Sequence, residues 1–506
     1  MNEPDTIKTK ADLLQAAFGV PELQIPPAKD INTRCDSIHA LGNSWSGDSE
    51  VKAALLQAAF GVPEQQIPPD ENGTFRYEAI YVIGECWSKD VHVKDALLRV
   101  AFGLPQQQIP PDEDRCVRSK AIYVIGECWG GDSEVKAALV RVAFGVPEQH
   151  IPPDEDNDAR YDAIYVLGKG WGGDNAIKAA LLRVAFGAPE QQIPPDVDND
   201  VRKSAVVALG EGWHGDAEVK AALLHASIGA PEHNIPPEKD DGVRSMAIYV
   251  LGVGWGGDAE AKAAILRAAI GVLEQNIPQD EAGNVRSRAI CALADGWGGD
   301  AEAKAAMLRA AIGAPEHNIP PDEDNGVRIL ALSALSDGWR GDSQAKAALL
   351  QAAFGVPEQE IPPDEDSDVR KSAIDALADG WREDSEAKAA ILRSAFGVPE
   401  QQILPDKDSA VRWKTIEALR TGWSGDPEVK AMLLRAAIGE REQQIPPDQD
   451  GDIRRFAIDA LDRGWRGDAE VIEKVRRAGE ISTVKHGENH DETKFLKKLL
   501  AMIEEK

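Results

Sequence analysis

The chain has 506 residues, and its 86 acidic and 56 basic side chains give a net charge of −30 at pH 7. This balance excludes the basic footprint that nucleic-acid binding requires and disfavours anionic membrane surfaces, whereas a basic or polar partner is accommodated easily. No apolar run approaches the length that spans a bilayer. The amino-terminal segment lacks the pattern of a signal peptide, and five cysteines do not form a disulfide framework, so we expect a cytoplasmic protein with reduced thiols.

Tryptophan recurs at a fixed interval of 42 residues along almost the whole chain. The eleven copies are Trp45, Trp87, Trp129, Trp171, Trp213, Trp255, Trp297, Trp339, Trp381, Trp423 and Trp465. A fixed period of this size is typical of a stacked array in which each unit contacts only its neighbours. We therefore expect one elongated solenoid, with the tryptophans as wedges in its core.

The first helix of each repeat is predicted from its two ends. In the repeat that follows Trp339, Asp342 suits a helix N-cap, and Lys346, four residues later, is predicted to form a surface ion pair with it. Helix-forming residues run from Ala345 to Phe354. Gly355, followed by a proline two residues later, predicts the end of the helix.

A proline-rich connector and a second helix complete the repeat. The run Ile361-Pro362-Pro363 predicts an extended segment, and Ile361 is expected to hold it against the core. Acidic residues then lead into a helix over about residues 369–378, whose apolar side chains form one buried stripe. Each unit is therefore predicted to be a helix, a long loop, a second helix and a tight turn.

The sequence as a whole predicts an all-α fold, an α-solenoid of eleven 42-residue HEAT-like helix pairs that forms a right-handed superhelix over residues 1–467. Residues 468–506 are predicted to form a C-terminal helical cap. Within the cap, 479–492 is polar and expected to be flexible, and 495–503 has the pattern of a final amphipathic helix.

The second helix carries a family resemblance. The run from Asp366 to Leu377 resembles a HEAT-type repeat, closest to the phycobilisome-lyase subclass, and is similar to repeats attached to NACHT-type signalling ATPases. An arginine follows the first apolar residue of this helix in all eleven copies, from Arg34 to Arg454. The resemblance implies that this arginine binds acidic groups at neighbouring repeats, with aspartates supplied nearby, as in Asp156 with Arg160.

Each repeat also departs from that family by an insertion of about a dozen residues, most often Gly-Val-Pro-Glu-Gln-Gln-Ile-Pro-Pro. Insertions in solenoids map to one face, which is often a binding face. Their near-identity here favours packing of one insertion on the next, and both alternatives stay open.

Motifs for chemistry are few. Asp154, Asp156 and Asp158 have the spacing that opens a calcium loop, but the twelfth position is a tyrosine where a bidentate glutamate is needed, which favours a helix-capping cluster. There is no His-Glu-x-x-His, no paired Cys-x-x-Cys, no phosphate loop and no serine nucleophile elbow. We expect no catalysis, no cofactor and no metal.

The positions that vary between repeats lie ten, nine, six and two residues before each tryptophan, on the exposed face of the second helix. All six tyrosines fall there, and tyrosine is a favoured interface anchor. From the eighth repeat the slot six before tryptophan becomes polar or acidic. The predicted partner-binding residues are Tyr77, Tyr81, Tyr123, Tyr161, Tyr165, Tyr249 and Trp413. Inheritance by recently duplicated repeats is the alternative explanation.

These observations predict a non-catalytic protein–protein interaction scaffold, monomeric, that holds an unidentified protein or peptide, favourably a basic one, on its concave face. Two alternatives stay open: a phycobilin lyase-like protein that handles a chromophore, and a sensor arm of a bacterial signalling or defence system.

Overall fold

A computed structural model describes most of the chain. The described residues are 9–20, 25–62, 65, 67–103, 110–146, 151–188, 191–229, 236–272, 279–314, 317–397, 405–439, 447–486, 494, 496–498 and 500–501. They form two compact units, Met1–Trp255 and Gly256–Lys506, each built from the same helical repeat. Among the described helices, none combines the length and the apolar character that crossing a membrane requires.

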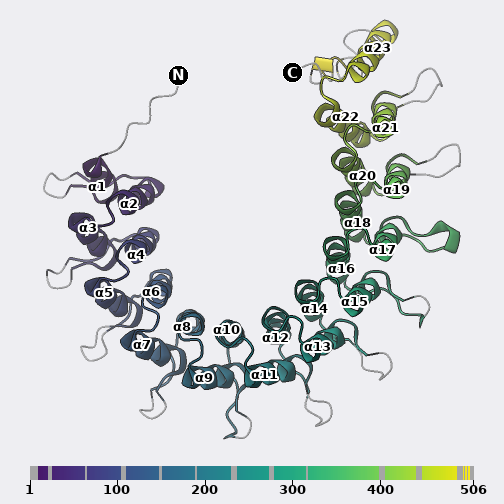
Figure 1. Ribbon diagram of the computed structural model, residues 1–506. Helices are drawn as coiled ribbons and strands as arrows, with labels where there is room; N and C mark the ends of the chain where they lie inside the picture. The colour runs from purple at the N-terminus through teal and green to yellow at the C-terminus, as the bar shows by residue number, and fades with distance from the viewer. Residues whose placement is uncertain are drawn as a thin grey trace. The chain divides into compact units, whose positions relative to one another are not determined.

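The first unit contains six helix pairs, with odd-numbered helices in one row and even-numbered helices in a second row (Figure 1). Its helices are α1 Lys10–Phe18, α2 Ile31–Trp45, α3 Ser49–Phe60, α4 Gly73–Trp87, α5 Val91–Phe102, α6 Arg115–Cys128, α7 Ser133–Phe144, α8 Asn157–Gly170, α9 Asn175–Phe186, α10 Asn199–Gly212, α11 Ala217–Ile228 and α12 Asp241–Gly254.

Within its described residues, the second unit repeats the pattern with five further pairs, followed by α23. Its helices are α13 Ala259–Ile270, α14 Gly283–Gly296, α15 Ala301–Ile312, α16 Asn325–Gly338, α17 Ser343–Phe354, the 3-10 turn η9 Pro357–Gln359, α18 Ser367–Gly380, α19 Ser385–Phe396, α20 Ser409–Gly422, α21 Pro427–Ile438, α22 Gly451–Trp465 and α23 Ala469–His486. The predicted all-α fold of 42-residue helix pairs is confirmed, whereas the right-handed superhelix stays a prediction.

The capping residues of the repeat act as predicted. Asp342 accepts the backbone N–H groups of Gln344 and Ala345 at the start of α17. At the other end Gly355 has φ +73°, and its N–H donates to the Gln351 carbonyl. Both ends of the helix are therefore set by residues within it or next to it in sequence.

In the pairs given below, the lysine does not bind the cap of its own repeat, as the sequence predicted, but the cap of the next repeat. Lys346 Nζ lies 2.9 Å from Asp384 Oδ2, because the Asp342 cap is already taken by Lys304 at 2.8 Å. The last copy has Ile472 at this position, where the ladder ends. The pairs are Lys10–Asp48, Lys52–Asp90, Lys94–Asp132, Lys136–Asp174, Lys178–Asp216, Lys262–Asp300, Lys304–Asp342, Lys346–Asp384, Lys388–Asp426 and Lys430–Asp468.

A second ladder of arginines joins consecutive repeats on the even helices. Arg118 Nε donates to the Ala101 carbonyl at the end of α5, and its Nη2 pairs with Asp154 of the next connector at 2.5 Å. The expectation that this arginine binds acidic groups of a neighbouring repeat is confirmed, but the partner of Arg160 is Asp196, 36 residues later, and not Asp156. The pairs are Arg34–Asp70, Arg76–Asp112, Arg118–Asp154, Arg160–Asp196, Arg202–Glu238, Arg286–Asp322, Arg328–Asp364, Arg370–Asp406 and Arg412–Asp448.

The connector is folded back on itself and is not simply extended. Val356 and Ile361 exchange backbone hydrogen bonds as an isolated antiparallel bridge, and Glu360 between them has a left-handed φ of 58°. The Ile361 side chain is only half-buried. The backbone hydrogen bonds of Ile361 therefore hold the connector in place more than burial of its side chain does. Much of the insertion in the other repeats lies outside the described residues, and the prediction that insertions pack on one another stays a prediction.

Eight of the period tryptophans are buried, with 5–8% of the side chain exposed, which confirms their predicted role as core wedges in those copies. The first three, Trp45, Trp87 and Trp129, are half-buried. These three follow Ser44, Cys86 and Cys128, whereas glycine precedes the buried eight. Both cysteine thiols lie 3.5 Å from a carbonyl of the preceding even helix.

The C-terminal segment differs in part from its prediction. Helix α23 continues to His486, so residues 479–486 are helical where the sequence predicted flexibility. Residues 487–493 lie outside the described part of the chain. Leu496 is buried, and the described residues between 494 and 501 are helical. The C-terminal cap over residues 468–506 stays a prediction.

Candidate functional site

The predicted tyrosines lie on the exposed side of the even helices, opposite their buried stripes. On α4, Ala79, Ile80 and Ile83 are buried, whereas Tyr77 and Tyr81 are half-buried. The same register leaves Tyr123 on α6 and Tyr165 on α8 half-buried, and Tyr161 is 42% exposed. The accessible face that the sequence predicted is therefore present in the first unit.

Four rings of this face occupy the same slot on successive even helices and form two ring pairs. We call them the aromatic column: His39 of α2, Tyr81 of α4, Tyr123 of α6 and Tyr165 of α8. The centroids of His39 and Tyr81 are 5.9 Å apart, and those of Tyr123 and Tyr165 are 6.4 Å apart with their planes at 15°. Stacked rings at such separations attract one another beyond the area they bury.

The close approach of α6 and α8 permits this stacking. A Cβ on Gly126 would lie only 2.4 Å from the Cβ of Val166, so no larger residue fits there without a shift. Gly126 and Val166 each follow their column tyrosine by few residues, three on α6 and one on α8. The small residue on the helix contact thus brings Tyr123 and Tyr165 together.

A lysine ammonium lies between the second and third members of the column. Lys120 Nζ of α6 is 4.4 Å from the ring centroid of Tyr81, 4.8 Å from that of Tyr77 and 5.4 Å from that of Tyr123. We call these three rings the tyrosine cage. All three distances are within the range of a cation–π interaction.

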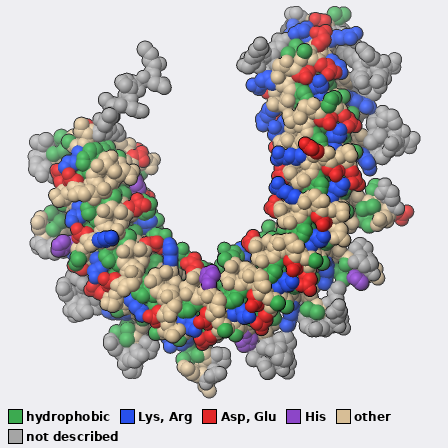
Figure 2. All heavy atoms as spheres, in the orientation of Figure 1, with side chains coloured by type: hydrophobic (Ala, Val, Ile, Leu, Met, Phe, Trp, Pro, Cys, Tyr) green, Lys and Arg blue, Asp and Glu red, His purple; other side chains and the backbone are tan. Residues whose placement is uncertain are grey.

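Carboxylates border the column on both sides. Glu78 Oε2 lies 3.0 Å from His39 Nε2, and Glu85 accepts a 2.5 Å hydrogen bond from the Tyr81 hydroxyl. That bond to a carboxylate raises the pKa of Tyr81, and burial lowers the pKa of Lys120. On the next helix Glu127 is paired with Lys169 at 2.6 Å. The column therefore lies in an acidic setting, although Figure 2 shows acidic and basic side chains interspersed along each unit.

Asp162 of α8 is a half-buried carboxyl on this face. Burial raises its pKa to about 6, and a hydrogen bond from the Ser119 side chain opposes the shift. An unfolded aspartate has a pKa of about 3.9, so the folded state holds the proton more tightly. Asp162 therefore contributes most to stability below about pH 4, and this contribution is lost as the pH rises through about 6.

We expect Asp162→Asn to remove this dependence and to stabilise the first unit at pH 7.5 by about 1–2 kcal/mol, after allowance for solvent screening. Thermal unfolding of both proteins between pH 4.5 and 7.5 measures it. The matched control is Asp36→Asn, at the same position of the first repeat, where the side chain is exposed. A stability gain that does not change with pH would contradict the assignment.

Two predicted residues lie apart from the column. Tyr249 of α12 is 37% exposed, but Val207 of α10 occupies the slot between it and Tyr165. Trp413 of α20 belongs to the second unit, where it packs on Phe456 at 5.7 Å. The structure thus brings together four of the six tyrosines, Tyr77, Tyr81, Tyr123 and Tyr165, with His39. Tyr161 lines the cavity described below, and Tyr249 and Trp413 lie outside the column.

The calcium candidates act as caps and ion-pair partners. Asp154 pairs with Arg118 and accepts the Asp156 N–H at 2.9 Å, and Asp156 accepts the Asp158 N–H at 3.2 Å. No group of three or more possible metal ligands occurs among the described residues.

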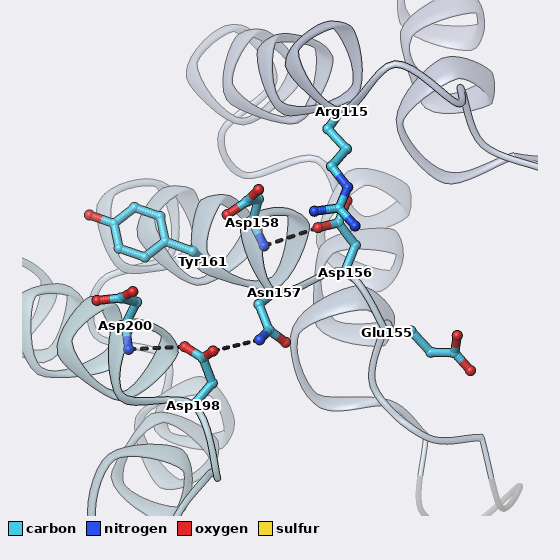
Figure 3. A pocket seen from close by; sticks show the side chains of 8 residues that line it. All are labelled: Arg115, Glu155, Asp156, Asn157, Asp158, Tyr161, Asp198 and Asp200. Carbon is cyan, nitrogen blue, oxygen red and sulfur yellow. Dashed lines mark hydrogen bonds between the residues drawn. The ribbon is translucent and has the colours of Figure 1, made fainter.

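A cavity of about 300 Å³ lies beside these caps (Figure 3). Its lining comes from the first turns of α6, α8 and α10 and from the loop before α8. The Asp198 carboxylate accepts both the Asp200 N–H and the Asn157 amide across adjacent repeats. The lining residues are Arg115, Glu155, Asp156, Asn157, Asp158, Tyr161, Asp198 and Asp200.

Sequence reasoning missed His39, Lys120, Glu78 and Glu85. His39 occupies the slot six residues before Trp45, so a search for any aromatic ring at that slot would have found it. Lys120 had no such signal, because its slot holds side chains of every kind along the chain and only the packing places its ammonium among rings.

No family model and no curated protein sequence matches the chain. Among solved structures, the chain is similar to importin beta, at 14% identity and a TM-score of 0.43, over 98% of this chain and 68% of that one. It is also similar to Kap95 in a Kap95:Nup1 complex, at 14% identity and a TM-score of 0.40, over 98% and 72% of the two chains. A third similarity is to Kap121p, at 13% identity and a TM-score of 0.38, over 97% and 52%. At these values no function carries over, and the phycobilisome-lyase and NACHT resemblances stay predictions.

Proposed function

We propose that this chain is a non-catalytic scaffold that binds a protein or peptide segment, and that the segment lies across the aromatic column of the first unit. The observation that carries the proposal is the column itself, in which two ring pairs, one from α2 and α4 and one from α6 and α8, occupy the same slot of consecutive repeats on an accessible face. Tyrosine and histidine rings offer large contact area, and tyrosine loses little side-chain entropy on binding.

The charges around the column favour a basic partner. Glu85 and Glu127 are exposed beside Tyr81 and Tyr123, and the whole chain carries a net charge of −30. Complementary charge speeds encounter and rejects acidic competitors more than it adds affinity. We therefore propose a partner segment that carries lysine or arginine among residues able to pack on tyrosine rings.

The two inter-repeat ladders support a preorganised surface. Arg118 of α6 bonds to the connector before α8, and Lys136 of α7 bonds to the N-cap of α9. The spacing of consecutive repeats is therefore held by side chains as well as by core packing. A rigid surface loses less entropy on binding than a mobile one. This favours a scaffold that holds its partner without large rearrangement.

The test compares two triple variants of the full chain. Tyr81→Ala, Tyr123→Ala and Tyr165→Ala together are expected to weaken binding of a protein captured from native lysate on the order of 100-fold. This corresponds to a total loss of about 3 kcal/mol, because losses at neighbouring hot-spot rings are not additive. The measurement is the dissociation constant of that captured protein, after its identification by mass spectrometry, with helicity checked by circular dichroism.

The matched control replaces the same slot in three consecutive repeats of the second unit, by Ser333→Ala, Asp375→Ala and Glu417→Ala. It is expected to change the dissociation constant by no more than about twofold, because these residues lie outside the column. Equal weakening by both triples, or none by the tyrosine triple, would show that the column is not the binding surface.

A further inference from the structure

Among the described residues, the close contacts of the Lys120 ammonium are with aromatic rings. Its nitrogen lies 4.4–5.4 Å from the three centroids of the cage, and no carboxylate of the described residues forms an ion pair with it. Burial in this position also lowers its pKa. Lys120 has therefore lost part of its hydration without gaining an anionic partner.

Other lysines on the exposed side of the even helices are held differently. Lys169 pairs with Glu127 at 2.6 Å, and Lys203 pairs with Asp200 at 2.6 Å. The most instructive case is Lys414, which occupies the same slot as Lys120, nine residues before the period tryptophan. Its Nζ lies near the Trp413 ring at 5.6 Å but also pairs with Asp375 at 2.9 Å. Lys120 therefore differs from Lys414 in the side chains around its ammonium and not in its position within the repeat.

The cage is suited to a cation and not to an anion. The ring faces carry negative potential, and the carboxylates of Glu78 and Glu85 add to it. An acidic ligand of Lys120 would meet both carboxylates and the tyrosine faces. An ammonium from outside meets the same favourable field that Lys120 occupies.

We propose that the tyrosine cage is a receptor for the side-chain ammonium of a lysine on the partner, and that Lys120 occupies it as an internal competitor. This inference rests on the proposed function, in that the partner is a basic protein segment lying across the column. The incoming ammonium takes the place of Lys120 between Tyr81 and Tyr123, and Lys120 moves into water and regains its hydration. No covalent bond changes, and the total charge in the cage stays the same.

While Lys120 occupies the cage, an outside ammonium cannot bind there. The measured affinity is therefore reduced in proportion to the fraction of molecules whose cage is open. Removal of the Lys120 charge should therefore strengthen binding of a lysine probe. We expect Lys120→Met in the full chain to bind the pentapeptide acetyl-Gly-Gly-Lys-Gly-Gly-amide about tenfold more tightly than the unmodified chain in calorimetric titration. Lys120→Gln should give a similar gain and provides a polar alternative in case the methionine variant folds poorly.

Three controls define the source of the gain. Lys414→Met removes a lysine from the same slot of the second unit and should leave the affinity unchanged. Tyr81→Leu and Tyr123→Leu added to Lys120→Met should abolish the gain, because leucine removes the ring faces. A pentapeptide with glutamine in place of lysine should bind no variant more tightly.

An unchanged affinity in both Lys120 variants, or an equal gain in Lys414→Met, would overturn the inference. This titration uses a defined peptide, so its outcome is separate from capture of the native partner. If the tyrosine triple variant no longer captures the partner but the Lys120 variants bind the peptide as the unmodified chain does, the scaffold function is retained and the role of the cage as a lysine receptor is rejected. If the Lys120 variants bind the peptide more tightly but the tyrosine triple variant still captures the native partner, the proposed function is rejected and the cage remains a site for an ammonium.

Discussion

Asp322→Ala is expected to destabilise the second unit by about 3–5 kcal/mol, the cost of leaving a buried charge without its partner. Arg286 Nε and Nη2 each lie 2.8 Å from an oxygen of Asp322, and only 2% of either side chain is exposed. The Asp322 carboxylate also accepts the Asp324 N–H at 2.9 Å at the start of α16. The substitution therefore removes a bidentate ion pair and a local hydrogen bond at once.

Stability in a repeat protein is distributed over its units, so the change is best measured as loss of amide hydrogen-exchange protection in α14 and α16, together with the urea midpoint. The matched control is Asp70→Ala, whose pair with Arg34 is more exposed and should cost about 1 kcal/mol. The double variant Arg286→Met and Asp322→Leu should lose less stability than Asp322→Ala alone. Equal losses at Asp70 and Asp322 would contradict this explanation.

Gly355→Ala is expected to cost about 3 kcal/mol, combining backbone strain of about 1–3 kcal/mol with a steric clash. Gly355 ends α17 with φ +73° and ψ −173°, a conformation that residues with a side chain rarely adopt. A Cβ there would lie 2.4 Å from the Ile361 carbonyl oxygen, on the other side of the connector. The connector bridge between Val356 and Ile361 would have to open.

The control is Gly338→Ala in the preceding even helix, where a Cβ would meet nothing within 4 Å. Alanine is favoured over glycine in a helix, so this variant should be neutral or more stable by up to about 1 kcal/mol. Thermal and urea unfolding of the two variants give the comparison. A loss at Gly338 as large as that at Gly355 would show that the conformation and contact of Gly355 are not the cause.

The helices and their ends could be predicted because their determinants are local. Asp342 caps the helix that it begins, and Gly355 ends the same helix twelve residues after Ser343. The ion pairs between repeats could not be predicted from local sequence. Lys346 is four residues from Asp342 in sequence, yet packing places its ammonium beside Asp384, and only the stacking of repeats decides between the two carboxylates.

The face of the candidate site could also be predicted, because the buried stripe of an even helix defines its opposite side. The sequence placed Tyr81, Tyr123 and Tyr165 there, which the structure bears out as a position in the fold. It did not indicate the position of Lys120, because a lysine at the same slot, Lys414, forms an ion pair instead. Such differences depend on residues of the adjacent helices, 42 positions away, and not on local pattern.

The binding constant of the captured partner, compared between the two triple variants, tests the central claim most directly. If the aromatic column is the binding surface, the tyrosine triple in the first unit weakens binding on the order of 100-fold, and the triple at Ser333, Asp375 and Glu417 changes it by no more than about twofold. Binding that survives loss of the three tyrosines, in a chain that keeps its helicity, would contradict the claim.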